Sequence, residues 1–289
     1  MSRTFIVTDS TADIPKELVN ELHIRIVPLT VMFGEEAFLD GIEMTPERFY
    51  PELVKSKELP TTSQPSPAEF TRTYESILAA HPDAQIISIH LSSGLSGTYQ
   101  SAVIGRSMLD DEQPVTVYDS KSASYGYGYL VVHAARMAAA GRETADIIRS
   151  LDELGQRRQL YFLVDTLEYL QKGGRIGKAA ATIGTLLNIK PILSIDQDGV
   201  IYPVEKARGH KKAMNRIIDM LEQAIKGQKV NVVLGHTADP STVEGLTDML
   251  RSRFNVADVL YTEIGAVIGT HVGPGTIAVF VWSVGDEGS

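Results

Sequence analysis

Along the first half of the chain, apolar positions fall into two alternating patterns: short β-branched runs and longer stretches with helical spacing. Phe5–Thr8, Gln85–Leu91 and Val115–Tyr118 have the length and composition of buried strands. Polar turns and then helically spaced apolar residues follow these runs, as in Thr98–Met108. The repeated order of strand, turn and helix predicts a mainly parallel, helix-covered sheet.

A proline-rich segment interrupts this pattern between residues 60 and 67. Its three prolines exclude a regular ladder, because proline lacks the backbone N–H donor. Ser66 and Glu69 have the spacing of a capping box, with Pro67 at the first helical position. The segment therefore leads into a helix that runs to about Ala80. The earlier run Ile24–Phe33 is predicted to be one strand.

The pattern changes near residue 143, and the second half lacks the regular alternation of the first. Thr144–Arg157 is predicted to be a linking helix, and Ala179–Leu187 a further helix. Ile192–Ile195 and Val200–Glu205 flank Asp198-Gly199, a dipeptide typical of a tight turn between antiparallel strands. The second half is therefore expected to be α+β with a mixed or antiparallel sheet.

The length of 289 residues favours two domains. We expect an α/β protein with domains at residues 1–143 and 144–289 and a ligand between them. The absence of cysteine excludes disulfides, cysteine-ligated zinc, iron–sulfur clusters and thiol nucleophiles. The seven histidines show no metal-ligand spacing, so neither a metal nor a cofactor is expected.

The net charge of −9 disfavours nucleic-acid binding, because an acidic protein repels phosphates. Two short basic segments, Lys172–Lys178 and Lys206–Lys212, are interrupted by glycine. We find neither a signal peptide nor an apolar run long enough to span a membrane, which leaves only transient membrane contact. These features, together with the lack of cysteine, lead us to expect a cytoplasmic protein.

Polar turns follow three of the predicted strands: Asp9-Ser10-Thr11, Ser92–Gly97 and Asp119-Ser120. Ligands of open parallel sheets bind at the carboxyl ends of strands, where helix N-termini present free N–H groups. The hydroxyls and glycines of Ser92–Gly97 favour a cradle for a carboxylate or a phosphate. For Asp9 and Asp119, an ordinary turn with a helix cap is an equal alternative.

Several catalytic motifs fail on inspection. Gly94–Thr98 lacks the last glycine of a nucleophile elbow, and the segment around Gly177 has Lys172 and Ala179 where a P-loop needs glycine and Ser or Thr. No G-x-G-x-x-G follows a strand. His271 lies in a glycine-rich loop, where its side chain is expected to project into a site.

At this point, segments across nearly the whole chain resemble the DegV family, in the family's order. They are Thr8–Thr11, Thr62–Pro65, Leu91–Tyr99, Tyr118–Ser120, Leu167–Ile176, Lys190–Leu193 and Gly269–Gly275. The resemblance implies two domains with a long-chain fatty acid between them. Carried over, the residues that hold or adjoin its carboxylate are Thr62, Ser92, Ser93, Gly94, Arg175 and His271.

Some members of this family resemble the binding subunit of bacterial fatty acid kinase, which presents the carboxyl group to a separate ATP-dependent kinase. The resemblance therefore implies a lipid-binding protein that is not itself an enzyme. In that role, Arg175 and His271 are hypothesised to be cations that neutralise charge during phosphoryl transfer. A passive carrier or lipid sensor without a kinase is the alternative.

The acyl chain needs an apolar tunnel, in which each buried methylene contributes about 0.8 kcal/mol. We expect tunnel-lining residues among a set for which ordinary core packing is the alternative: Ile183, Leu186, Leu187, Ile189, Ile264 and Ile268. Two further functions compete with fatty acid binding. One is an acyl hydrolase that uses Ser93 with His271, and the other is a binder of phosphorylated metabolites.

Overall fold

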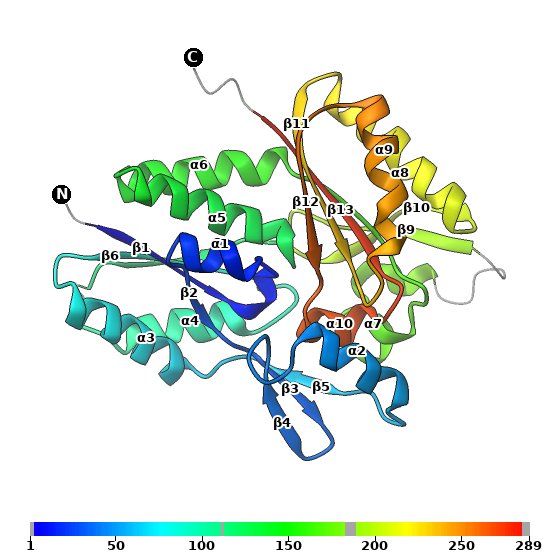
Figure 1. The fold of residues 1–289 in the computed structure, drawn as a ribbon. Helices are drawn as coiled ribbons and strands as arrows, with labels where there is room; N and C mark the ends of the chain where they lie inside the picture. The colour runs from blue at the N-terminus through cyan, green and yellow to red at the C-terminus, as the bar shows by residue number, and fades with distance from the viewer. Residues whose placement is uncertain (1–2, 111–112, 183–188, 285–289) are drawn as a thin grey trace.

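The computed structural model describes residues 3–110, 113–182 and 189–284. Its first sheet has four parallel strands in the order β2-β1-β6-β7 (Figure 1). The strands are β1 (Thr4–Asp9), β2 (Arg25–Val27), β6 (Gln85–His90) and β7 (Val115–Asp119). The predicted parallel sheet is therefore confirmed.

Helices cover both faces of this sheet, because β1 and β6 carry apolar residues on alternate sides. Ile6 and Ile87 pack against the helices on one face, whereas Phe5 and Ile86 pack against those on the other. The first face carries α1 (Lys16–Glu21), α5 (Tyr125–Ala139) and α6 (Thr144–Arg157). The second carries α3 (Pro67–Ala80) and α4 (Thr98–Ser107). The predicted capping box begins α3, where the N–H of Ser66 donates to Glu69 at 2.7 Å.

A small antiparallel sheet in the order β4-β3-β5 projects from the first domain. It comprises β3 (Thr30–Phe33), β4 (Glu36–Leu39) and β5 (Thr61–Ser63), and it packs with α2 (Pro46–Lys55). The prediction of one strand over Ile24–Phe33 is wrong, because β2 ends at Val27 and β3 begins at Thr30 in a different sheet. Pro28 lies between them and has no N–H to continue a ladder.

The second sheet has six strands in the order β10-β9-β8-β13-β11-β12. Only β11 and β12 run parallel among these neighbours, so the predicted mixed sheet is confirmed. The strands are β8 (Gln159–Leu163), β9 (Ile189–Ile195), β10 (Ile201–Arg208), β11 (Lys229–His236), β12 (Asn255–Glu263) and β13 (Ile277–Ser283). The antiparallel pair β9–β10 is the hairpin predicted from Asp198-Gly199, and Gly199 has a φ of 77°.

The two faces of this sheet have different coverings. Its outer face packs against α8 (His210–Ile225) and α9 (Ser241–Arg253). Its inner face turns toward α5, the short helix α7 (Glu168–Lys172) and α10 (Ala266–Val272), as Figure 1 shows. Where a helix is predicted over Ala179–Leu187, the structure has a 3₁₀ segment, Gly177–Thr182, and residues 183–187 lie outside the described part of the chain.

The predicted domain boundary between residues 143 and 144 stays a prediction. Helix α6 packs against α5, and the hydroxyl of Thr144 donates to Gln85 and lies 3.1 Å from that of Thr4. These contacts place α6 beside the first sheet, and the strands of the second sheet begin only at Gln159. Within the described residues, no helix is both long and apolar enough to cross a bilayer.

Candidate functional site

A pocket with about 830 Å³ of empty space lies between the two domains. The inner face of the second sheet supplies one wall, through side chains such as Phe162, Ile201, Ala278 and Phe280. Leu91 and Leu95 close the pocket from the first domain, directly after β6. Most of the surface that lines this space is apolar, as expected of a site for a hydrocarbon group.

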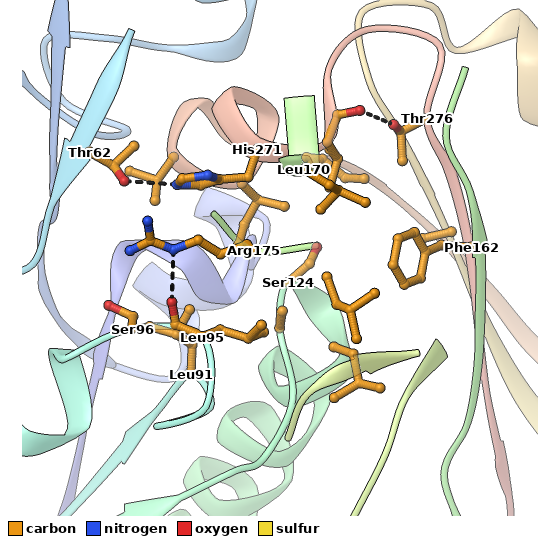
Figure 2. A pocket seen from close by; sticks show the side chains of 18 of the residues that line it. Thr62, Leu91, Leu95, Ser96, Ser124, Phe162, Leu170, Arg175, His271 and Thr276 are labelled. Atoms are coloured by element: carbon orange, nitrogen blue, oxygen red, sulfur yellow. Dashed lines mark hydrogen bonds between the residues drawn. The ribbon is translucent and has the colours of Figure 1, made fainter. Parts of the chain in front are cut away.

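Polar side chains gather at one end of this pocket. Figure 2 shows Thr62, His271, Arg175 and Ser96 together, on the opposite side from Phe162. The hydroxyl of Thr62 lies 2.9 Å from Nε2 of His271. The first two residues come from β5 and α10, and Arg175 from the loop after α7, so three distant segments build this end.

The Gly-Gly sequence before Arg175 explains how this side chain reaches the pocket. Gly174 has a φ of 71°, which is the left-handed conformation that ends a helix in a Schellman motif. The N–H of Arg175 donates to the carbonyl of Leu170 at 2.9 Å, and that of Gly174 to Gln171 at 3.1 Å, as the motif requires. The chain thus turns back over α7 at Arg175.

The guanidinium of Arg175 is held by backbone oxygens and by no carboxylate of the described residues. Its Nε donates to the carbonyl of Leu95 at 3.1 Å, and its Nη1 donates to that of Gly173 at 2.7 Å. The first bond crosses from one domain to the other. Because a guanidinium has five N–H donors, further donors remain for an anionic ligand.

Burial and the nearby charge of Arg175 together lower the pKa of His271 to about 4. Its imidazole is therefore neutral at neutral pH, whereas the guanidinium of Arg175 beside it is charged. The Nδ1 atom of His271 is buried and has no hydrogen-bond partner within the described part of the chain. This result does not fit the hypothesis that both residues act as cations.

Two carboxyl groups, of partly buried Asp13 and buried Asp40, fix the N-terminus of α10 against the first domain. The carboxylate of Asp13 accepts from the N–H of Gly265 at 3.0 Å and from the hydroxyl of Ser124 at 2.5 Å. Burial raises the pKa of Asp13 well above its ordinary value. Burial likewise raises the pKa of Asp40 to about 6, although Ser10 and the first N–H groups of α10 donate to it. These contacts hold the N-terminus of α10 in place, and His271 lies near the C-terminal end of the same helix.

The predicted residues Ser92, Ser93 and Gly94 lie in the turn after β6 but are not among the residues that line the pocket. The hydroxyl of Ser92 donates to the carbonyl of Gly199 at 2.8 Å, and Gly94 donates to that hydroxyl at 3.1 Å. The hydroxyl of Ser93 donates to Asp119 at 2.6 Å. The turn therefore docks on the β9–β10 hairpin, and its direct contact with a carboxylate stays a prediction.

The side chains of Asp9 and Asp119, which follow the first and third of the predicted strands, also have partners within the first domain. Asp9 is fully buried, where its carboxylate accepts from the N–H of Leu91 and the hydroxyl of Tyr127 and lies 2.9 Å from Nδ1 of His90. Asp9 therefore joins β1 to β6 and α5. Asp119 holds Ser93, and we assign both aspartates to the architecture of the turns.

Of the predicted tunnel residues, Ile264 and Ile268 line the pocket. Ile189 is partly buried at the start of β9 and does not line it. Ile183, Leu186 and Leu187 lie outside the described residues. Other lining residues were missed: Gln64, Ser96 and Ser124 among polar ones, and Leu91, Leu95 and Phe162 among apolar ones. Gln64, Ser96 and the two leucines stand within the motifs that carry the resemblance.

The geometry does not support a hydrolase. The hydroxyl of Ser93 is bonded to Asp119, whereas the imidazole of His271 contacts Thr62, so the two do not form a nucleophile–base pair. Across residues 3–110, 113–182 and 189–284, no three His, Asp or Glu side chains are grouped as metal ligands.

The fold and the pocket together define a two-domain α/β protein with a largely apolar pocket that has a polar end. The family model described as "Uncharacterised protein, DegV family" matches residues 3–284. The chain belongs to the DegV family. It is 41% identical to the protein DegV of Bacillus subtilis over 276 residues, which cover 95% of this chain and 97% of that protein.

Solved structures of two relatives match the whole architecture. A DegV family protein from Thermus thermophilus, described by its fatty acid binding, superposes with a TM-score of 0.91 at 36% identity, covering 98% of this chain and all of that one. DegV of Bacillus subtilis, described as a fatty acid binding protein, superposes with a TM-score of 0.88 at 38% identity and the same coverage.

Proposed function

We propose that this protein binds a long-chain fatty acid in the pocket between its domains, with the carboxylate at the end formed by Thr62, Arg175 and His271. One observation carries the proposal: the pocket has an apolar wall and, at one end, a cation with unused donors beside a hydroxyl and a neutral imidazole. The fatty acid binding of the two structural relatives supports it.

Both ends of the ligand gain free energy in this arrangement. A carboxylate beside the guanidinium of Arg175 stays ionised, because charge-assisted hydrogen bonds replace those of water. Along the apolar wall, each buried methylene contributes about 0.8 kcal/mol, so a dozen supply on the order of 10 kcal/mol before ordering costs. The tail therefore provides affinity, and the polar end sets the orientation of the ligand.

The protein then acts in the cytoplasm as a presenting subunit, which offers the bound carboxyl group to a separate ATP-dependent kinase that forms an acyl phosphate. The position of Arg175 at the head-group end supports this role, because its guanidinium can neutralise charge on a transferring phosphoryl group. A passive carrier or lipid sensor would have the same pocket but would lack the kinase. Recovery of an acyl-phosphate-forming activity with the protein from native lysate distinguishes the two.

Titration of delipidated protein with palmitate tests the binding proposal. Thr62→Val removes the hydroxyl at the head-group end and keeps the shape, so we expect palmitate affinity to fall about threefold to tenfold. Thr116→Val, on an exposed position of β7, is the matched control and should leave the affinity unchanged. Absence of palmitate binding by the wild type, or equal affinity of Thr62→Val, contradicts the assignment.

A further inference from the structure

One part of the pocket wall carries polar groups at a distance from the polar end. Ala123 and Ser124 line the pocket at the N-terminus of α5, and Ser124 is only 4% exposed. Figure 2 shows Ser124 on the Phe162 side of Arg175, away from Thr62. The chain of a fatty acid whose carboxylate meets Arg175 would therefore run past this segment of the wall.

The backbone of Ser124 has a conformation that serine rarely adopts. Its φ is 54° and its ψ is −149°, outside the regions that residues with a Cβ atom prefer. Glycine would adopt this conformation without steric cost, so a serine at this position indicates a role for the hydroxyl. An N-cap serine usually accepts a bond from the N–H groups of the first helical turn. Here the hydroxyl instead donates to the carboxyl group of Asp13 at 2.5 Å.

The first backbone donors of α5 also lack partners. Ser124 and Tyr125 are buried, and their N–H groups donate to no acceptor within the described part of the chain. Because Ser124 turns its hydroxyl toward Asp13, it does not cap these groups itself. Buried N–H groups without a partner are rare in folded proteins, and at a pocket wall they indicate a bound acceptor atom.

An unpaired side chain lies at the same helix end. The hydroxyl of Ser122 is buried and has no hydrogen-bond partner among the described residues. A Cβ atom on Gly126 would approach both this hydroxyl, at 2.5 Å, and the ring of Phe280, at 3.0 Å. The hydroxyl therefore points at the first turn of α5, beside an aromatic ring that lines the pocket. It is a second and independent sign that this helix end is built for a polar group.

The groups at this helix end match an uncharged oxygen atom. The hydroxyl of Ser124 gives its hydrogen to Asp13, so its oxygen remains able to accept a bond, whereas the N–H groups can donate one. An alcohol both donates and accepts, and it fits both kinds of group. A second anion fits less well, because Arg175, at the polar end, is the only lysine or arginine among the described residues that line the pocket.

We propose that the N-terminus of α5 binds a hydroxyl group carried partway along the acyl chain, so that the protein prefers hydroxylated long-chain fatty acids to unsubstituted ones. The inference rests on the proposed function, because the chain passes Ser124 only if the carboxylate lies at the polar end. An unsubstituted chain would cover these polar groups without bonding them, which weakens binding. A site built to bond a hydroxyl discriminates against the analogue that lacks it.

Competition between stearate and a series of monohydroxystearates for delipidated protein tests the proposal. The series carries the hydroxyl at successive carbons, and the wild type should bind one member about fivefold to tenfold more tightly than stearate. Ser124→Gly relieves the backbone strain and removes the hydroxyl, so it should lose this preference while its affinity for stearate stays within about twofold. Ser124→Ala, which keeps a Cβ atom, should lose the preference as well. Ser107→Gly, exposed at the end of α4, is the control and should retain it.

The outcomes separate this inference from the function on which it rests. If the wild type binds neither stearate nor any hydroxystearate, both proposals fail. If it binds stearate at least as tightly as every hydroxystearate, the unpaired groups bind water alone and only this inference fails. A preference that survives in Ser124→Gly and Ser124→Ala also overturns it, because the hydroxyl would then be recognised elsewhere. Since the preference is a ratio within one variant, a general loss of stability does not imitate its loss.

Discussion

The hydroxyl of Thr62 lies 2.9 Å from Nε2 of His271, although 209 residues separate them in the chain. The contact joins β5 of the small sheet to α10 of the second domain. Arg175 lies beside it and contributes a bond from its Nε to the carbonyl of Leu95. This polar end of the pocket therefore exists only when the two domains are packed together, and a ligand bound there would contact both.

The charges at this end lead to a prediction for the kinase reaction. Arg175→Ala should reduce acyl phosphate formation by more than about tenfold, since one donor to a developing charge is worth that much or more. His271→Ala should cost less, because burial and Arg175 lower the pKa of His271 to about 4 and leave it neutral. In both variants, the fraction of bound lipid that is retained should exceed the fraction of acyl phosphate formation that is retained. The measurement is acyl phosphate formation with the cognate kinase, alongside the lipid content of each variant.

Arg149→Ala, in an exposed pair on α6, is the control for this experiment. Two results would contradict a role of Arg175 in presenting the carboxyl group. One is an Arg175→Ala variant as active as the wild type, and the other is a loss of bound lipid equal to its loss of activity. The first result would place the charge stabilisation in the kinase. The second would make Arg175 a residue for binding alone.

The apolar wall predicts how the chain-length preference can be changed. Ala278 on β13 lines the pocket, and Ala278→Leu adds three carbon atoms to that wall. The variant should prefer fatty acids about two to four carbons shorter, because the added volume displaces methylenes worth about 0.8 kcal/mol each. Affinities for a series of saturated fatty acids measure the shift. Ala79→Leu, on an exposed position of α3, is the control and should leave the order of affinities unchanged. An unchanged chain-length preference in Ala278→Leu would show that the acyl chain does not lie against Ala278.

Asp40 predicts a pH dependence of stability. Burial raises its pKa from 3.8 to about 6, so the folded state holds a proton that the unfolded chain releases above pH 3.8. The folded state therefore loses up to about 3 kcal/mol from this group as the pH rises from about 4 to about 6. Asp40→Asn lacks this titration. The stability of Asp40→Asn relative to the wild type should thus increase across this range.

Urea unfolding at several pH values measures the difference in unfolding free energy between Asp40→Asn and the wild type. The prediction concerns how this difference changes with pH. Exposed Asp83→Asn is the control and should differ from the wild type by a constant amount. A constant difference for Asp40→Asn as well would show that Asp40 titrates in the folded protein as it does in the unfolded chain.

The packing of α2 beside α10 gives a further prediction. The hydroxyl of Tyr50 donates to the carbonyl of Ile264 at 2.7 Å, and both groups are buried at the domain junction. Tyr50→Phe should lower the free energy of unfolding by about 1 to 2 kcal/mol, because it leaves that carbonyl without its donor. Chemical unfolding measures the change. Tyr202→Phe, partly exposed on β10, is the control and should lower the free energy of unfolding by less. An equal loss in both variants would show that the hydrogen bond of Tyr50 contributes nothing particular to stability.

Much of the fold follows from local signals. The strand–turn–helix order predicts the first sheet, Ser66 and Glu69 predict the start of α3, and Asp198-Gly199 predicts the hairpin. Each of these signals depends on residues close together in the chain. The small sheet was not predicted, because its strand β5 pairs with β3 across some thirty residues of intervening chain.

The residues of the site are harder to predict from local signals in the sequence. Thr62 and Arg175 were identified through the family resemblance, since no periodicity relates residues from different domains. His271 was first indicated by its glycine-rich loop, and the resemblance then placed it near the carboxylate. Asp13 and Asp40 gave no signal at all, because their burial arises only when α10 docks on the first domain. The hydroxyls of Ser92 and Ser93 looked like a cradle, but a hydroxyl-rich turn can equally hold a hairpin in place, as Ser92 does with Gly199.

Mass spectrometry of an organic extract of the purified, denatured protein tests the central claim most directly. We expect one long-chain fatty acid per protein molecule, with a distribution of chain lengths that reflects the size of the apolar pocket between the domains. An extract without lipid, from a protein that also takes up no added fatty acid, would contradict the account. The polar end of the pocket would then have to serve a different and smaller anion.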